Sequence, residues 1–197
     1  AMRAYYDNDM ELRARAIQMV DELERCQNEN EDGWCASIPP VYLDRIVRNK
    51  WVWAPHYNVH KTFMGLADVY KYCNYSKAEQ IIDKWSDWFL RWTNQFDEEK
   101  MQDILDWETG GMMEVWADLY ALTGKEKYHT LMKRYTHYRF FNPILEGKDI
   151  LTNTHANTTI PEAHGMARAY QVTGEEIYRR FAEGYLEQVL ELRDHYC

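Results

Sequence analysis

Three segments of the chain align with one another without gaps at a spacing of 50 residues, starting at residues 65, 115 and 165. Alanine recurs at one aligned position, tyrosine at a second, and residues that tolerate a left-handed backbone at a third. A period of this length indicates a repeat architecture in which each unit buries its apolar face against the next. The aligned positions are Ala67, Ala117 and Ala167; Tyr70, Tyr120 and Tyr170; and Asn74, Gly124 and Gly174.

Each repeat has the pattern of two helices joined by a short link. Links of this length force the two helices of a pair to run antiparallel. We expect the first helices at about 58–73, 109–123 and 159–173, and the second helices at about 76–95, 125–140 and 175–194. A further helix at about 8–28 precedes the first pair, and its buried stripe is expected to contain Ala14, Ile17, Val20 and Leu23. No segment has a convincing strand pattern.

Four of the expected helix starts carry Ser or Thr followed three residues later by Glu, which is the pattern of a capping box. In such a box the two side chains satisfy backbone N–H groups that the first helical turn leaves free. We therefore expect these residues to fix the N-termini of their helices. The pairs are Ser76 and Glu79, Thr123 and Glu126, Thr159 and Glu162, and Thr173 and Glu176.

The predicted fold class is all-α, an α/α toroid with about seven main helices arranged as antiparallel hairpins. The first helices are rich in small and apolar residues and suit a crowded inner ring, whereas the charged second helices suit an outer ring. A closed (α/α)6 barrel of six hairpins would need roughly 300 residues at this period. The 197 residues supply hairpins at about 58–95, 109–140 and 159–194. The chain is therefore either an open solenoid or a fragment, and we expect residues 1–197 to form a single all-α domain that is a fragment of a larger barrel.

The charge of the chain argues against nucleic acids and anionic membranes as partners, and its cysteines do not match a zinc-finger pattern. The formal net charge is −9, and no Lys/Arg cluster is long enough for a nucleic-acid face. The acidic balance also argues against binding to an anionic membrane surface. No run of about 18 apolar residues is present, so no transmembrane helix is expected. The cysteines match neither a CxxC pair nor a zinc-finger spacing, and mostly reduced thiols are expected; they are Cys26, Cys35, Cys73 and Cys197.

Three long connections lead into the first helices, at about 29–57, 96–108 and 141–158, and all enter the same end of the stack. Long loops gathered on one face are where binding and catalytic residues concentrate. These loops combine Trp and Tyr with His, Asn and carboxylates, a mixture that suits a sugar, because aromatic faces stack on its C–H groups and polar groups pair with its hydroxyls. The candidate catalytic carboxylates are Asp68, Asp106, Glu108 and Glu114. Glycoside hydrolysis usually needs two such groups.

Each of these loop residues also has a purely structural interpretation. Trp51 and Trp53 can plug the first loop against the core, and Gly110-Gly111 can simply allow a tight turn and close helix packing. Asn157 can serve as a helix cap, and His60 can be a core histidine. A metal site built from histidines is not favoured, because the spacing of His60, His155 and His164 matches no compact metal motif. The convergence of three loops favours a binding site.

Three sequence blocks together resemble the β-L-arabinofuranosidase family of glycoside hydrolases, long catalogued as a bacterial domain of unknown function. The resemblance runs from about residue 50 to the C-terminus. The blocks occur in the same order as in that family, each just before an inner helix. They are WAPHYNVHK at 53–61, ETGGMME at 108–114, and Asp149 followed by HANTTIP at 155–161.

The resemblance implies an (α/α)6 catalytic barrel followed by β-sandwich domains, and retaining hydrolysis of β-L-arabinofuranosides of plant glycans. It also implies a zinc-held cysteine thiolate as nucleophile and a glutamate as acid/base, both in the second half of the barrel. We therefore expect no catalytic residue and no metal ligand within this chain, and assign the nucleophile to none of its cysteines. The resemblance carries over a substrate-binding role to Tyr57, His60, Glu108, His155 and Asn157, and to His164.

The leading hypothesis is the N-terminal half of a glycoside hydrolase barrel, inactive by itself, with a carbohydrate as partner. One alternative is a non-catalytic helical-repeat module that binds a glycan or serves as a scaffold. Another is a different toroid enzyme with its acid/base pair among the four carboxylates. A half barrel leaves apolar edges uncovered, so self-association through these edges is expected. Localisation stays open between the cytoplasm, the periplasm and secretion.

Overall fold

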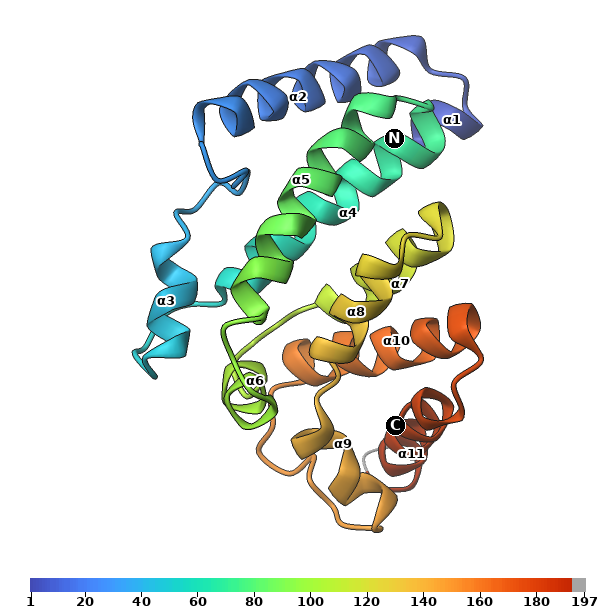
Figure 1. Ribbon diagram of the computed structural model, residues 1–197. Helices are drawn as coiled ribbons and strands as arrows, with labels where there is room; N and C mark the ends of the chain where they lie inside the picture. Colours follow the sequence, from blue (N-terminus) through green and yellow to red (C-terminus); the bar gives the residue numbers. More distant parts are fainter. Residues whose placement is uncertain (193–197) are drawn as a thin grey trace.

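The computed structural model describes residues 1–192 and confirms the all-α prediction. Within this range no strand is present and the chain forms eleven helices (Figure 1). They are α1 (Met2–Tyr6), α2 (Met10–Glu29), α3 (Val41–Val47), α4 (Pro55–Cys73), α5 (Ser76–Thr93), α6 (Glu98–Leu105), α7 (Met112–Thr123), α8 (Glu126–Arg134), α9 (Tyr138–Leu145), α10 (Ala156–Thr173) and α11 (Glu176–Leu192).

The helices are arranged in two rows, as expected for part of an α/α toroid. Helices α4, α7 and α10 lie side by side in the inner row, and α5, α8 and α11 each pack on the inner helix that precedes them (Figure 1). Helix α2 extends the outer row by packing on α5. A groove lined mainly by apolar side chains, about 730 Å³ in volume, lies between α2 and α4. Self-association through such an edge stays a prediction.

The link within each hairpin is set by a residue in the left-handed conformation, as the repeat predicts. Asn74, Gly124 and Gly174 have φ values of 48°, 66° and 71° and end α4, α7 and α10. Glycine and asparagine accept this conformation at lower cost than other residues. The backbone N–H groups of Gly124 and Gly174 donate to the carbonyl oxygens of Tyr120 and Tyr170. The closing residue of the repeat therefore reverses the chain.

The predicted capping boxes do not form. Thr123 is the last residue of α7, and its hydroxyl donates to the Leu119 carbonyl and accepts the N–H of Lys125. At the end of α10 the Thr173 hydroxyl likewise donates to the Ala169 carbonyl and accepts the backbone N–H of Glu175. These threonines therefore finish one helix and brace the link, because the link is too short for a separate N-cap box.

The other two predicted boxes fail because the helix starts lie elsewhere. Ser76 is the first residue of α5 and makes no capping bond, and Thr159 lies inside α10, which begins at Ala156. The side chains that do cap helices are Asp9, which accepts from the N–H of Leu12 at α2, and Asp97 at α6.

Several predicted boundaries also need correction. The helix expected at 125–140 is interrupted after Arg134 and resumes as α9, and the helix expected from 109 begins at Met112. Helices α1, α3, α6 and α9 were not anticipated, and the last two residues of the helix expected at 175–194 lie outside the described range. On α2, Val20 is buried but Ala14 is exposed, so the predicted stripe is only partly correct.

Aromatic residues from successive hairpins join the rows into one core. Phe63 of α4 stacks on Trp85 of α5 with ring centroids 4.1 Å apart, and its edge meets Trp116 of α7 at 5.0 Å. All three side chains are fully buried. Glycine brings the inner helices together: a Cβ on Gly165 of α10 would lie 2.6 Å from the Cβ of Met113 on α7. This close packing fixes α10 relative to α7.

Charged residues connect the outer helices at the surface. Lys127 at the start of α8 reaches Asp83 and Asp87 on α5, at 2.8 and 2.7 Å, and Lys77 on α5 reaches Asp21 and Glu24 on α2. Exposed pairs of this kind contribute at most about 1 kcal/mol each. No helix in the described part of the chain is long and apolar enough to cross a membrane.

Candidate functional site

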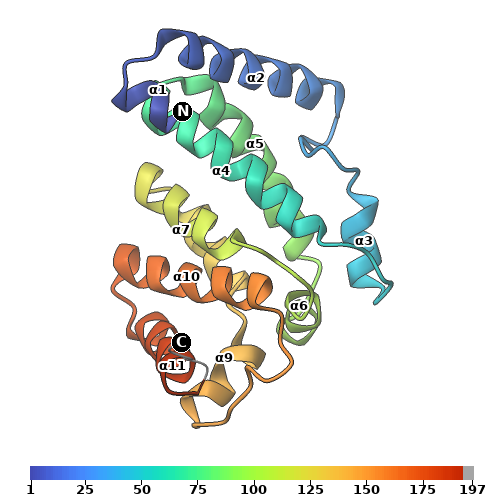
Figure 2. The ribbon, with the colours of Figure 1, turned by 180° about the vertical axis from the view of Figure 1, so that it is seen from behind.

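The three long connections enter one end of the inner row, as predicted. The N-termini of α4, α7 and α10 lie at the same end, with α3, α6 and α9 placed along it (Figure 2). Helix α3 contacts both α4 and α6, so the first and second connections pack together. The three sequence blocks singled out above therefore lie near one another at this end.

The glycine pair of the second block lies directly against His60. A Cβ on Gly111 would lie 2.5 Å from His60 Nε2, and one on Gly110 would lie 3.2 Å from Nδ1 and 3.3 Å from Tyr57 Cδ2. Gly110 also has φ of 59°, a left-handed value that favours glycine. Close approach of the second connection to the histidine ring therefore requires glycine at both positions.

His60 is buried without a protein partner. Its side chain is 4% exposed, and neither ring nitrogen forms a hydrogen bond with any described residue. Burial and the nearby Lys61 lower the pKa of His60 to about 4, so the imidazole is neutral near pH 7. A neutral imidazole offers one donor and one acceptor. A core histidine would normally have its nitrogens satisfied, so this ring has unused capacity for hydrogen bonding.

Replacing Gly111 with alanine should destabilise the protein by about 1–3 kcal/mol, because the new methyl group would overlap the buried His60 ring. Urea unfolding measures this change, and NMR of the His60 ring reports its displacement. Gly65→Ala is the matched control, since a Cβ there meets nothing within 4 Å and the residue is on the exposed side of α4. Equal stability of the two variants would contradict the proposed close approach.

Glu108 and His155, from the second and third connections, line the same cavity of about 400 Å³. Glu108 is half-buried and His155 is exposed. Neither side chain forms a hydrogen bond or an ion pair with a residue in the range 1–192. The remaining lining residues are Leu105, Asp106, His137, Arg139, Phe140, Ile150, Thr154, Thr158, Thr159 and Glu162.

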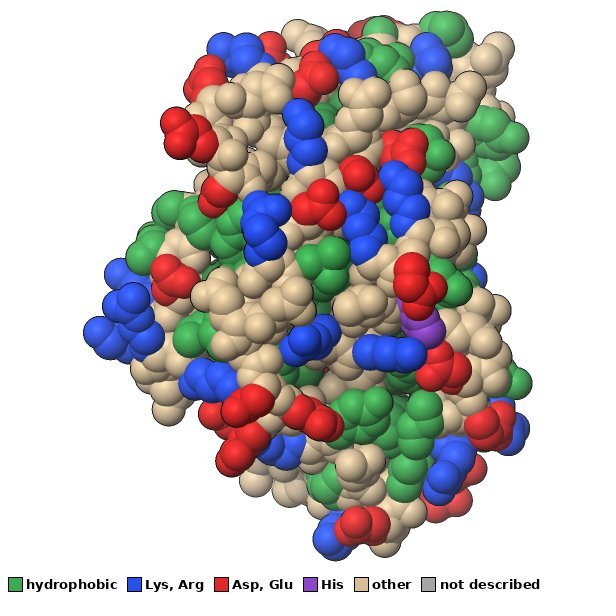
Figure 3. Space-filling model, viewed as in Figure 1, with side chains coloured by type: hydrophobic (Ala, Val, Ile, Leu, Met, Phe, Trp, Pro, Cys, Tyr) green, Lys and Arg blue, Asp and Glu red, His purple; other side chains and the backbone are tan. Residues whose placement is uncertain are grey.

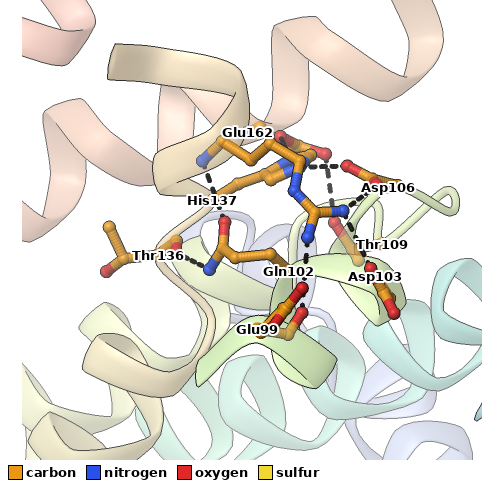
Figure 4. A network of polar contacts seen from close by, with 9 residues as sticks. Glu99, Gln102, Asp103, Asp106, Thr109, Thr136, His137 and Glu162 are labelled. Atoms are coloured by element: carbon orange, nitrogen blue, oxygen red, sulfur yellow. Dashed lines mark hydrogen bonds and ion pairs between the residues drawn. The ribbon is translucent and has the colours of Figure 1, made fainter. Parts of the chain in front are cut away.

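A buried network supports one wall of this cavity (Figure 4). His137 lies between two carboxylates, with Nδ1 2.9 Å from Glu162 Oε2 and Nε2 3.0 Å from Asp106 Oδ1. The hydroxyl of Thr109 donates to Glu162 at 3.3 Å, which ties the Glu-x-Gly-Gly block to α10. Because each ring nitrogen faces a carboxylate oxygen, both nitrogens must carry a proton, and His137 is an imidazolium.

The electrostatics agree with this geometry. Burial alone would lower the pKa of His137, but the hydrogen bonds to Asp106 and Glu162 raise it to about 9. The bond from His137 and the neighbouring Arg139 hold the pKa of Asp106 below its usual value. Arg139 Nη1 also donates to Asp103 at 2.9 Å and to Asp106 at 2.6 Å. The hydrogen bonds therefore hold the side chains of this wall in place, and the lowered pKa keeps Asp106 ionised.

Sequence reasoning missed His137 and assigned Glu162 to a capping box. His137 lies in the break between α8 and α9, where a continuous helix was expected. Glu162 lies one turn inside α10 and is almost fully buried, so its carboxylate needs a cationic partner. The sequence contained only part of the information needed. A glutamate among apolar residues on an inner helix indicates that the carboxylate has a buried polar partner, but the pattern does not identify that partner.

Of the six proposed substrate-binding residues only Glu108 and His155 line this cavity; Tyr57 and His60 lie against the glycine pair, and Asn157 and His164 lie on α10. Asn157 is exposed in the first turn of α10 and makes no capping bond to the described chain. His164 is exposed about two turns further on and is close enough to Glu114 of α7 to lower the pKa of that carboxyl. Burial first, and then Asp118, raise the pKa of Glu114. Of the four candidate carboxylates, only Asp106 and Glu108 line the cavity.

The two loop tryptophans do not plug the core. Trp51 and Trp53 are 77% and 78% exposed, so that interpretation is wrong. Among the residues described, no group of three or more His, Cys, Asp and Glu side chains is placed to hold a metal ion. Burial and the nearby Cys26 raise the pKa of Cys35 to about 12, which keeps this thiol protonated. Cys197 lies outside the described residues.

Comparison with known families agrees with the resemblance in the sequence blocks. The family model described as "Beta-L-arabinofuranosidase, GH127 catalytic domain" matches residues 1–195, which is nearly the whole chain. No individual curated protein sequence matches the chain. The match includes the N-terminal residues, for which the sequence blocks gave no resemblance.

Proposed function

The chain belongs to the GH127 family of β-L-arabinofuranosidase catalytic domains, and from this premise we propose that its loop end binds a β-L-arabinofuranosyl residue of a plant glycan. Family membership supports a glycoside hydrolase-like function and a carbohydrate substrate. The choice of sugar and the residues that hold it are our proposal.

The cavity between the second and third connections carries the proposal. Glu108 and His155 line it with no partner in the described chain, while the wall formed by Asp106, His137 and Glu162 is fully paired. Unpaired polar groups in front of this wall are free to accept and donate hydrogen bonds to hydroxyls. Phe140 adds an aromatic surface to the same lining, which suits the C–H side of a sugar ring.

His60 and Tyr57 form a second part of the proposed binding site. The two unsatisfied nitrogens of the neutral His60 ring offer one donor and one acceptor, and a sugar hydroxyl reaches them when the Gly110-Gly111 segment that covers them moves aside. Tyr57 is partly exposed, and the centroid of its ring lies 5.9 Å from that of the His60 ring. Since Gly110-Gly111 follows Glu108 closely in the chain and lies against His60, one short segment connects both parts of the site. The family resemblance also proposes roles for Asn157 and His164.

We further propose that this chain is the substrate-binding half of the catalytic barrel and has negligible turnover alone. The family resemblance implies zinc and a cysteine nucleophile, with both contributed by residues outside this chain. The described residues offer no fitting set of ligands, and the Cys35 thiol is protonated rather than a thiolate. We therefore derive no catalytic step through the metal. Turnover of an aryl β-L-arabinofuranoside by the purified chain would contradict this part of the proposal.

Titration of methyl β-L-arabinofuranoside into the chain, followed by NMR or calorimetry, tests the binding site. We expect Glu108→Gln and His155→Gln each to weaken binding about tenfold, because glutamine keeps only one of the two carboxylate oxygens of Glu108 and cannot place its amide where the ring nitrogens of His155 lie. Unfolding free energies should change by less than about 0.5 kcal/mol, since neither side chain has a protein partner. Glu187→Gln, on the exposed face of α11, is the charge-matched control. Unchanged binding in both cavity variants would refute the assignment.

A further inference from the structure

The segment between α3 and α4 presents two tryptophans to solvent. Trp51 and Trp53 are 77% and 78% exposed, whereas the other six tryptophans are buried or half-buried. Exposing an indole forfeits the burial energy of one of the largest apolar side chains. Two such side chains, separated in the sequence by one residue, form an exposed apolar patch that needs a functional explanation.

The backbone holds this segment in a defined shape. Asn49 and Ala54 bracket it with φ values of 52° and 30°, and Ala54 has no side-chain group to compensate for the left-handed conformation. Such strain at a non-glycine residue costs about 1–2 kcal/mol and persists only where surrounding contacts enforce it. Val52 is 8% exposed and anchors the segment to the core. Exposed Trp51, buried Val52 and exposed Trp53 alternate as in an extended chain, so both indoles face outward.

Unpaired cations surround the first of these tryptophans. Arg45, Arg48 and Lys50 line a shallow pocket of about 340 Å³ together with Trp51, Val41 and one carboxylate, Asp44. None of the three cations forms an ion pair with any residue from 1 to 192; Arg45 lies over the ring of Tyr42 instead. Lys and Arg side chains gather at the edge of the molecule where α3 lies (Figure 3). This local excess of positive charge contrasts with a net charge of −9 for the chain.

We propose that this surface, the tryptophan platform of Arg45, Arg48, Lys50, Trp51 and Trp53, binds a polysaccharide that carries uronic-acid carboxylates. The indole faces stack on sugar rings, and the guanidinium and ammonium groups pair with the carboxylates. The proposal rests on the exposed tryptophans and unpaired cations and is independent of the cavity that contains Glu108 and His155. It would hold an acidic glycan at the end of the helix rows where the three connections enter.

Charge complementarity favours an acidic glycan over other occupants. A neutral glycan would use the tryptophans but leave the cations without a role. Nucleic acids and anionic membranes carry denser charge, and proteins that bind DNA typically neutralise about 6–10 phosphates, more than three cations can match.

Binding of a de-esterified oligogalacturonate, compared with its fully methyl-esterified neutral counterpart, tests the proposal. Tryptophan fluorescence or calorimetry at low and high salt gives both affinities. We expect the acidic oligomer to bind about tenfold more tightly than the ester, with the difference lost at high salt. The double variants Trp51→Ala/Trp53→Ala and Arg48→Gln/Lys50→Gln should each weaken acidic-oligomer binding about tenfold. The second variant should leave binding of the ester unchanged.

Two controls distinguish the platform from general effects. Lys133→Gln/Arg180→Gln removes the same charge from exposed positions elsewhere, and Leu186→Ala removes an exposed apolar side chain; both should bind like the wild type. Methyl β-L-arabinofuranoside should still bind Trp51→Ala/Trp53→Ala, so failure of the cavity and failure of the platform are separable. Three results would overturn the proposal. The ester could bind as tightly as the acidic oligomer, or the platform variants could bind the acidic oligomer like the wild type. Single-stranded DNA or phosphatidylserine vesicles could also bind more tightly than the acidic oligomer.

Discussion

Replacing Glu162 with leucine should lower the free energy of unfolding by about 3–5 kcal/mol at about pH 7. The side chains of Glu162 and His137 are 5% and 8% exposed, and their atoms are 2.9 Å apart. Removing the carboxylate leaves a buried imidazolium with Asp106 alone and takes the acceptor from the Thr109 hydroxyl. Removing one member of a buried charge pair costs more than removing both, because the remaining charge has lost its compensation.

Urea unfolding of a double-mutant cycle measures this effect. Glu162→Leu and His137→Leu should each be strongly destabilising, whereas the double variant should be less destabilised than the sum of the two. Glu187→Leu on the exposed face of α11 is the control and should change stability by less than about 0.5 kcal/mol. Additive effects, or a loss below about 1 kcal/mol for Glu162→Leu, would show that the network is not a buried ion cluster.

Stability should also fall as the pH rises from about 6.5 to about 9, the interval between the ordinary pKa of histidine and that of His137. The folded-state pKa is raised, so the folded protein holds the proton more tightly than the unfolded chain does. The stabilisation that comes from the proton on His137 is therefore complete below about pH 6.5 and is lost as the pH passes about 9. A rise of this size in the pKa of His137 corresponds to roughly 3 kcal/mol in the free energy of unfolding.

The pH effect is isolated by comparison with His137→Gln, which has no titrating group at this position. The difference in unfolding free energy between wild type and variant should shrink steadily through this interval. Other groups that titrate in the same range cancel in the difference. A difference that stays constant with pH would mean that His137 is not held as an imidazolium.

Both predictions bear on the proposed site, because the network joins the two connections that form the cavity. Thr109 follows Glu108 in the chain, and Glu162 lies on the helix that His155 precedes. When Glu162 or the proton on His137 is lost, the tie between these segments is weakened. Sugar binding through Glu108 and His155 should then weaken along with stability.

The sequence by itself determined the repeat and most of its consequences. The 50-residue period predicted the three hairpins, and Asn74, Gly124 and Gly174 predicted where the inner helices end, because only a few residue types accept a left-handed backbone. The order of long connections predicted that the loops enter one end of the stack. The three sequence blocks pointed to the family that the chain belongs to.

Local pattern was insufficient for the helices inside the connections. Helices α3, α6 and α9 have seven or eight residues, too few to be stable in isolation, so their helicity depends on packing against other elements. The capping boxes failed for a related reason. Thr123 and Thr173 have the right spacing for a cap, but the chain reversal at the following glycine gives their hydroxyls nearer partners.

The tertiary structure alone decided the chemistry of the site. Asp106, His137 and Glu162 come from segments about 25 to 56 residues apart and meet only because α10 packs on both α7 and α11, and α11 packs on α9. The same packing sets Gly111 against His60 and leaves Trp51 and Trp53 in solvent. Helical periodicity indicates which side of a helix is apolar. It does not indicate which polar side chains pair, because these pairs join distant segments of the chain that meet only in the folded protein.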